Sequence, residues 1–248
     1  MVKSEYILFI NSILLSNTLV NPSNPLYGKA VIDCYKYQLV YINNKWETQK
    51  FKNTTEHIIV FILESPHKSE FKNGRPLEPL KNGNQYFKCI NDLISKSSNF
   101  KLDKAYIYSI YLMNAIQFQC SLGLEPTYYR DYIFLYYWYN LNNKNDFENR
   151  LLSFCQSNYS KIDYIINCVT IGDHKNAKTI YNSNNKSYDN MPINLTKFIT
   201  KYCNLNKTYG SLKEIVQESI ENVTKAFNIK LLKGNHPSRW FSSNSKIE

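Results

Sequence analysis

Three polar clusters follow apolar runs in this sequence, and their side chains could do acid–base or hydrogen-bonding chemistry. The run 58–63 ends at the cluster 64–67 (ESPH), and the other two clusters are 114–119 (NAIQFQ) and 235–240 (NHPSRW). They supply a carboxylate, amides and imidazoles, which can bind a polar ligand or transfer a proton. A carboxylate in such a place can also simply solvate a loop, so the chemistry depends on whether the three clusters meet.

The elements that must position these clusters can be read from the hydrophobic pattern. We expect strands at 57–63, 105–113, 163–172 and 227–234, and helices at 4–16, 84–97, 128–140, 146–157, 173–181 and 211–226. Apolar runs separated by helices predict an α/β fold, a three-layer α/β/α sandwich with a central, mainly parallel sheet. Ligands of such sheets bind beyond the carboxyl ends of the strands, which is where all three clusters would lie.

Composition limits the class of protein. The 248 residues, 43% hydrophobic and 20% charged, predict one globular domain over 1–248. No apolar stretch reaches the length of about 18 residues that a membrane span needs, and the apolar start at 4–16 is more typical of a first helix than of a signal peptide. The six cysteines lie far apart without a C-x-x-C pair, which argues against a zinc or disulfide framework and favours a reducing, cytoplasmic location.

The net charge of +10 indicates a polyanionic partner such as DNA. A solvated, lysine-rich surface would give the same charge without any such partner. The chain contains neither an internal repeat nor a linker long enough to separate domains.

The order and spacing of several motifs resemble the uracil-DNA glycosylase superfamily. The turn LESPH at 63–67 is similar to the G-E-A-P-G motif of the thermostable branch, and a strand ending in an asparagine and the H-P-S motif follow in the family's order. The resemblance covers about 57–241, and its further matching positions are Glu70, Gly74, Pro76, Asn114, 169–177 (VTIGDHKNA) and 236–238 (HPS).

This resemblance implies a monofunctional DNA glycosylase, which flips a base out of DNA and hydrolyses its N-glycosidic bond. His236 would donate to the oxygen of the departing base, a type of contact worth about 3 kcal/mol. Glu64 would stabilise the sugar cation and orient water, because Ser65 occupies the position of the family's usual catalytic aspartate. Alternatively, His236 caps a strand end and Glu64 bonds to backbone.

The resemblance also implies residues that bind the base and the DNA. Asn114 offers a donor and acceptors that complement the pairing edge of a pyrimidine. Trp240 would fill the space left by the flipped base, although a tryptophan here can equally belong to the core. We expect base contacts from His67, Leu77, Asn114 and Gln117, and DNA contacts from Lys68, Ser238, Arg239 and Trp240.

Departures from the family pattern bear on the cofactor and the substrate. Phe118 occupies the nearest position to a cluster-binding cysteine of the thermostable branch, so we expect no cofactor and no metal. Leu77 stands where the family has a base-stacking phenylalanine, and His67 where one branch has a bulk-excluding tyrosine. These changes favour a pyrimidine larger than uracil, although divergence within a uracil-excising enzyme would also produce them.

Two other functions compatible with the sequence stay open. One is a non-catalytic protein of glycosylase fold that binds DNA or a nucleotide, which the missing aspartate favours. The other is a hydrolase of free nucleosides or nucleotides. For the glycosylase itself we expect a monomer that acts either in repair of deaminated bases or in defence against phage DNA with modified bases.

Overall fold

The computed structural model describes residues 30–66, 89–118, 142–172, 211–240 except the Ser238 side chain, 245–248 and the single positions 70, 76, 120, 131, 134, 135, 137 and 138. The helices predicted at 4–16 and 173–181 lie outside these residues, as do His67, Lys68 and Leu77. Of the helix predicted at 128–140, the described positions are all helical.

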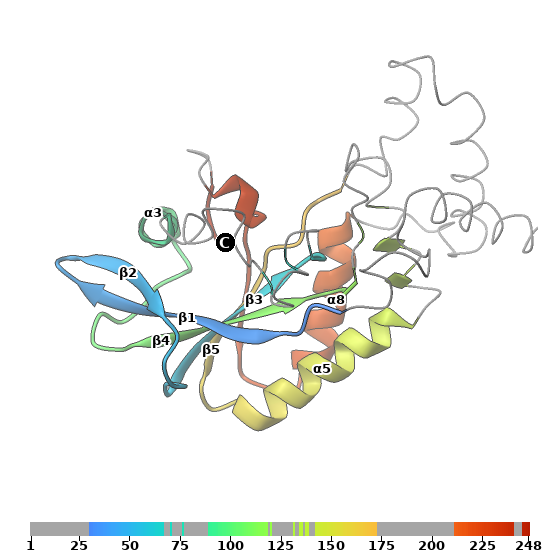
Figure 1. Ribbon diagram of the computed structural model, residues 1–248, viewed down its shortest axis with the longest axis horizontal. Helices are drawn as coiled ribbons and strands as arrows, with labels where there is room; N and C mark the ends of the chain where they lie inside the picture. Colours follow the sequence, from blue (N-terminus) through green and yellow to red (C-terminus); the bar gives the residue numbers. More distant parts are fainter. Residues whose placement is uncertain are drawn as a thin grey trace, which may run out of the picture.

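The core of the fold is a six-stranded mixed sheet with strand order β2-β1-β4-β3-β5-β6 (Figure 1). β4, β3, β5 and β6 are parallel neighbours, whereas β1 pairs antiparallel with both β2 and β4. The strands are β1 (Cys34–Ile42), β2 (Lys45–Lys50), β3 (His57–Leu63), β4 (Tyr108–Asn114), β5 (Ile162–Asn167) and β6 (Lys230–Lys233). The predicted α/β class and the four predicted strands are therefore confirmed, although β5 ends at Asn167 rather than at Gly172.

The hairpin of β1 and β2 was not predicted. Ile42 pairs with Lys45, so the loop between the strands is Asn43 and Asn44. Both asparagines have positive φ, 51° and 62°, the combination that a type I′ turn requires and that asparagine tolerates better than most residues. The hairpin makes the sheet mixed at this side.

Both faces of the central strands are buried. In β3, Ile58, Val60 and Ile62 belong to one hydrophobic cluster, while Ile59, Phe61 and Leu63 belong to another. This explains the continuous apolar run, because a strand covered on both faces has no polar side to alternate with.

Helices cover both sides of the sheet (Figure 1). Buried side chains of α5 (Asn143–Asn158) and α8 (Leu212–Thr224) join the first cluster. Those of α3 (Ile90–Lys96), together with Trp240 and Ile247, join the second. Among the described residues, no helix has the length and apolar character needed to cross a membrane.

Candidate functional site

The carboxyl ends of the parallel strands bring the three polar clusters to one edge of the sheet. Leu63, the last residue of β3, pairs in register with Asn114, the last residue of β4. The backbone amides that follow Asn114 continue this pairing, because Ala115 N donates to Leu63 O (2.8 Å) and Ile116 N donates to Glu64 O (3.0 Å). His236 follows β6 by three residues, with β5 between β6 and β3.

Asn114 has a buried side chain that forms no hydrogen bond with the residues that the structure describes. The residue is 1% exposed, and within the described part of the chain neither Nδ2 nor Oδ1 has a partner. Leaving such a group unpaired costs about 1–3 kcal/mol, so the large majority of buried polar atoms are paired. The unpaired amide therefore points to a ligand.

The backbone of Asn114, by contrast, is held on both sides. Its N–H donates to Asp33 Oδ1 (3.1 Å), and its carbonyl accepts from Arg150 Nη2 (3.0 Å). Arg150 also donates to Ala115 O (3.3 Å) and Asp146 Oδ2 (2.8 Å), and its Nη1 forms an ion pair with Asp33. We call Asp33 and Arg150 the Asn114 clamp.

Neither residue of the Asn114 clamp was predicted from the sequence. Asp33 precedes an unpredicted strand, and Arg150 lies in α5, where an arginine is unremarkable. Burial raises the pKa of Asp33, opposed by Arg150 and by hydrogen bonds from Asn114 N and the Gln117 side chain. Gln117, predicted to bind a base, thus has its side chain engaged with Asp33.

Glu64 is buried at the end of β3, with an exposure of 3%. Its Oε2 accepts a hydrogen bond from the Thr170 hydroxyl, which ties the end of β3 to the segment after β5. Ser65, half-buried, follows it directly. Thr170 lies within the predicted VTIGDHKNA segment, but no sequence signal distinguished it as a partner of Glu64.

The segment that carries His236 is fixed where it leaves β6. Gly234 N donates to Asn167 O (2.9 Å), and Lys213 Nζ donates to Gly234 O (2.5 Å). A Cβ added at Gly234 would lie 3.0 Å from Cys168 Sγ, so a larger residue would crowd this position. His236 itself is half-buried, and its carbonyl accepts from Arg239 N (2.8 Å) in the 3-10 helix η3 (Pro237–Arg239).

Trp240 belongs to the core, which corrects its predicted role in DNA insertion. Its side chain is 2% exposed, and its ring centroid lies 5.5 Å from that of Phe61 in β3. The indole Nε1 donates to Asn235 O (2.8 Å). A side chain held in this way cannot enter a duplex without leaving the hydrophobic cluster that it shares with Phe61. Arg239 is exposed and can still contact DNA, whereas the Ser238 side chain lies outside the described atoms.

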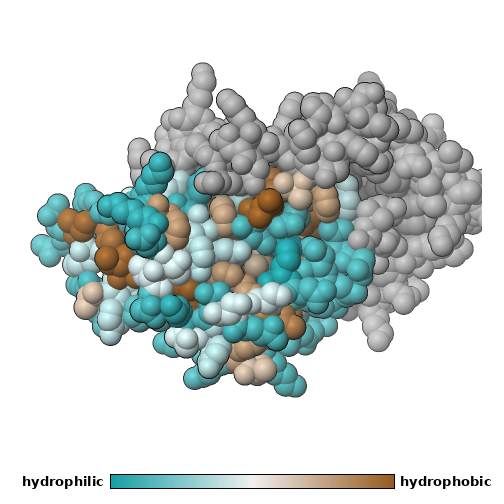
Figure 2. All heavy atoms as spheres, turned by 60° about the horizontal axis from the view of Figure 1, so that its bottom comes forward, coloured by the Kyte–Doolittle hydropathy of each residue, from teal (hydrophilic) through white to brown (hydrophobic). Residues whose placement is uncertain are grey.

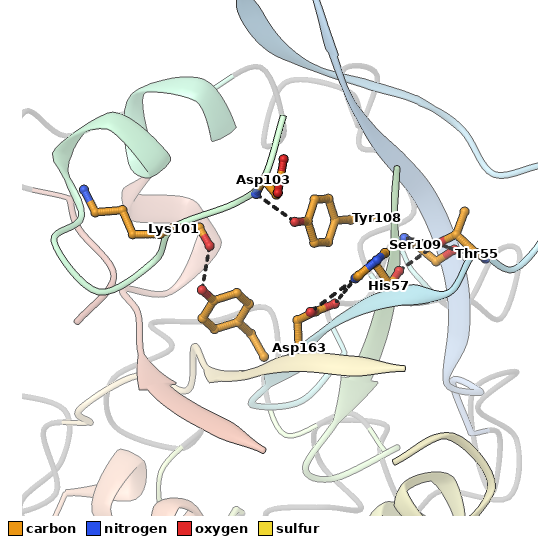
Figure 3. Close-up of polar contacts among 8 residues, drawn as sticks. Thr55, His57, Lys101, Asp103, Tyr108, Ser109 and Asp163 are labelled. Atoms are coloured by element: carbon orange, nitrogen blue, oxygen red, sulfur yellow. Dashed lines mark hydrogen bonds and ion pairs between the residues drawn. The ribbon is translucent and has the colours of Figure 1, made fainter. Parts of the chain in front are cut away.

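A further group of polar side chains, not predicted from the sequence, lies at the amino ends of β3, β4 and β5, opposite the candidate site (Figure 3). We call it the His57–Tyr108 cluster. His57 Nδ1 lies 3.1 Å from Asp163 Oδ2, and the His57 ring stacks on Tyr106 with centroids 3.9 Å apart. Tyr108 accepts from Asp103 N (2.9 Å), in the loop that precedes β4. Because its polar groups bond to one another across β3, β4 and β5, we assign this cluster to the fold.

The described residues contain no group of three or more His, Cys, Asp or Glu side chains placed to hold a metal ion. No protein-family model, curated protein or solved structure matches the chain. The candidate site therefore rests on its own geometry.

Proposed function

We propose that the chain is a monofunctional DNA glycosylase with a uracil-DNA glycosylase-like, three-layer α/β/α fold. The observation that supports this most is the buried amide of Asn114, which no described residue pairs, at the end of β4. The neighbouring end of β3 carries Glu64, and the chain after β6 supplies His236 at the same edge. An amide suits the pairing edge of a base, and a carboxylate with an imidazole suits the charges that base release creates.

The reaction breaks the bond between the sugar and the base and adds water to the sugar carbon. Asn114 holds the flipped base through its pairing edge. His236 donates to a base oxygen as negative charge develops there. Glu64, oriented by the Thr170 hydroxyl, faces the sugar cation and directs the water. Because the Asn114 side chain is 1% exposed, a base reaches it only after a local rearrangement at this edge.

DNA as the substrate is supported by the net charge of +10 and by Arg239, which is exposed one turn from His236. The enzyme acts as a cytoplasmic monomer, in repair or in defence against phage DNA. Its substrate base is a pyrimidine whose substituent at the 5-position is larger than the hydrogen atom of uracil.

The test is incubation of the protein with duplex and single-stranded oligonucleotides that contain uracil, 5-hydroxymethylcytosine or its glucosylated form, followed by alkali. Strand breaks at the modified position, with full activity in EDTA, are expected. Intact strands throughout the panel would contradict the proposal. Base release from free nucleosides alone would instead identify a nucleoside hydrolase.

A second candidate is a non-catalytic protein that binds DNA or a nucleotide with the same edge of the sheet. It is favoured by Ser65, which stands at the position of the family's aspartate, and by the bond of Glu64 to Thr170, which also serves a purely structural role. Retention of a modified oligonucleotide without any abasic site would identify this function.

A further inference from the structure

We infer that Asn114 reads pyrimidines of both hydrogen-bonding types, the keto type of uracil and thymine and the amino type of cytosine. This inference rests on the proposed function, because it concerns the base that the site binds. It follows from a difference between two buried asparagines at the ends of parallel strands, Asn114 in β4 and Asn167 in β5.

Asn167 has a fixed amide. Its Nδ2 donates to Lys213 O (2.9 Å) and Gln217 Oε1 (3.0 Å), and its Oδ1 accepts from Val169 N (3.1 Å). Donors and acceptors around the side chain thus determine which end is oxygen and which is nitrogen. A ligand would meet this amide in one orientation only.

Asn114 has a fixed backbone and an unfixed amide. The Asn114 clamp holds its N–H and its carbonyl (3.1 and 3.0 Å), so the side chain starts from a defined position. No described residue pairs with Nδ2 or Oδ1. The terminal torsion of an asparagine has two wells about 180° apart, and here no hydrogen bond to a described residue favours one of them over the other.

The two orientations match the two types of pyrimidine. A keto pyrimidine presents an N–H beside a carbonyl oxygen, whereas cytosine presents a ring nitrogen acceptor beside an amino donor. Rotating the amide exchanges its donor and acceptor, so each type forms two hydrogen bonds with Asn114. The ligand class is therefore a pyrimidine of either type, and selection among pyrimidines falls to groups other than Asn114.

The test compares single-turnover release of 5-hydroxymethyluracil and 5-hydroxymethylcytosine from otherwise identical oligonucleotides at about pH 8, where a carboxylate is ionised. The wild type should release both at rates within about tenfold of each other. Asn114→Asp, which can only accept, loses one of the two hydrogen bonds with each type, so release of both bases should slow by on the order of 10²-fold. Asn145→Asp makes the same charge change at an exposed position of α5 and should leave both rates unchanged.

Release of one type by the wild type at a rate more than about 10³ above the other would overturn the inference and leave the proposed function intact. Slower release of only one of the two bases by folded Asn114→Asp would also overturn it, because Asn114 would then bind a single type. Release of neither base would overturn the proposed function together with the inference. The wild-type comparison decides even if Asn114→Asp does not fold.

Discussion

At the scale of single residues, Asn114 carries a stability cost that its proposed function explains. A buried amide without a partner destabilises the free protein, and a bound base would supply the missing hydrogen bonds. Asn167, equally buried at 1% exposure, has no such cost because its amide is fully engaged. The two residues have the same type and the same kind of position, so their difference in hydrogen bonding distinguishes the proposed binding role of Asn114 from the structural role of Asn167.

This contrast predicts opposite effects of the same substitution. Asn114→Leu should raise the free energy of unfolding by about 1 kcal/mol, because an unpaired polar group is replaced by an apolar one of similar size. Asn167→Leu should lower it by about 1–3 kcal/mol, since its partners lose their bonds. Urea denaturation measures both. Equal destabilisation by the two variants would show that Asn114 is also held by the protein.

At the scale of elements, the Asn114 clamp connects three parts of the fold that are distant in sequence. Arg150 in α5 lies 117 positions from Asp33, which precedes β1, and both bind the end of β4. The clamp thus fixes the end of the strand that carries the candidate base-reading residue.

Breaking the clamp should be costly. Arg150→Ala leaves the Asp33 carboxylate, whose side chain is 7% exposed, without its cation, and we expect a loss of about 3 kcal/mol in the free energy of unfolding. Lys144→Ala removes a surface pair with Glu148 on the same helix and should cost less than about 0.5 kcal/mol. Similar losses in thermal or urea unfolding for the two variants would mean that the clamp does not stabilise this edge.

The His57–Tyr108 cluster makes the free energy of unfolding sensitive to alkaline pH. Burial, together with the nearby Asp163 and Asp103 charges, raises the pKa of Tyr108 to about 12, although a hydrogen bond from Asp103 N opposes this. The unfolded chain loses this proton near pH 10 and the folded protein holds it, so the stabilisation is complete below about pH 10 and is lost as the pH rises toward 12.

Tyr108→Phe should therefore make the decline in stability between about pH 10 and 12 shallower, by up to about 1.4 kcal/mol per pH unit. Tyr159→Phe, at a side chain that is 61% exposed, should leave the decline unchanged. Urea unfolding at a series of pH values measures the difference. Parallel curves for Tyr108→Phe and the wild type would contradict the assignment.

The elements show which features can be predicted from sequence. β3 was predicted with its correct bounds because both of its faces are buried, which leaves an uninterrupted apolar run. β1 was missed although Tyr35, Tyr37 and Leu39 alternate with Lys36 and Gln38, a pattern typical of a strand with one buried face. The polar strand ends were found because each follows an apolar run, whereas their partners Asp33, Arg150 and Thr170 depend on tertiary contacts that no local pattern records.

At the scale of the whole molecule, charge and surface decide what the protein can approach. On the face in Figure 2, hydrophilic side chains prevail over the described part and hydrophobic ones are scattered among them, which is ordinary for a protein surface. The net charge of +10 favours a polyanion at long range, while the proposed binding of a base takes place at the edge that carries Asn114 and His236.

DNA binding should therefore weaken steeply with salt. A plot of log affinity against log salt concentration should fall with a slope of about −0.9 for each phosphate neutralised in a duplex. Fluorescence anisotropy with a labelled duplex measures it, and Arg239→Gln should reduce the slope by about one phosphate. A flat plot would mean that the positive charge serves solvation alone.

The most direct test of the central claim is single-turnover release of the free base from modified duplex DNA, followed by mass spectrometry for the wild type and His236→Ala. If His236 stabilises the departing base, the variant should release it more slowly by on the order of 10²–10³, with DNA affinity nearly unchanged. A folded His236→Ala protein that releases the base at the wild-type rate would contradict the account.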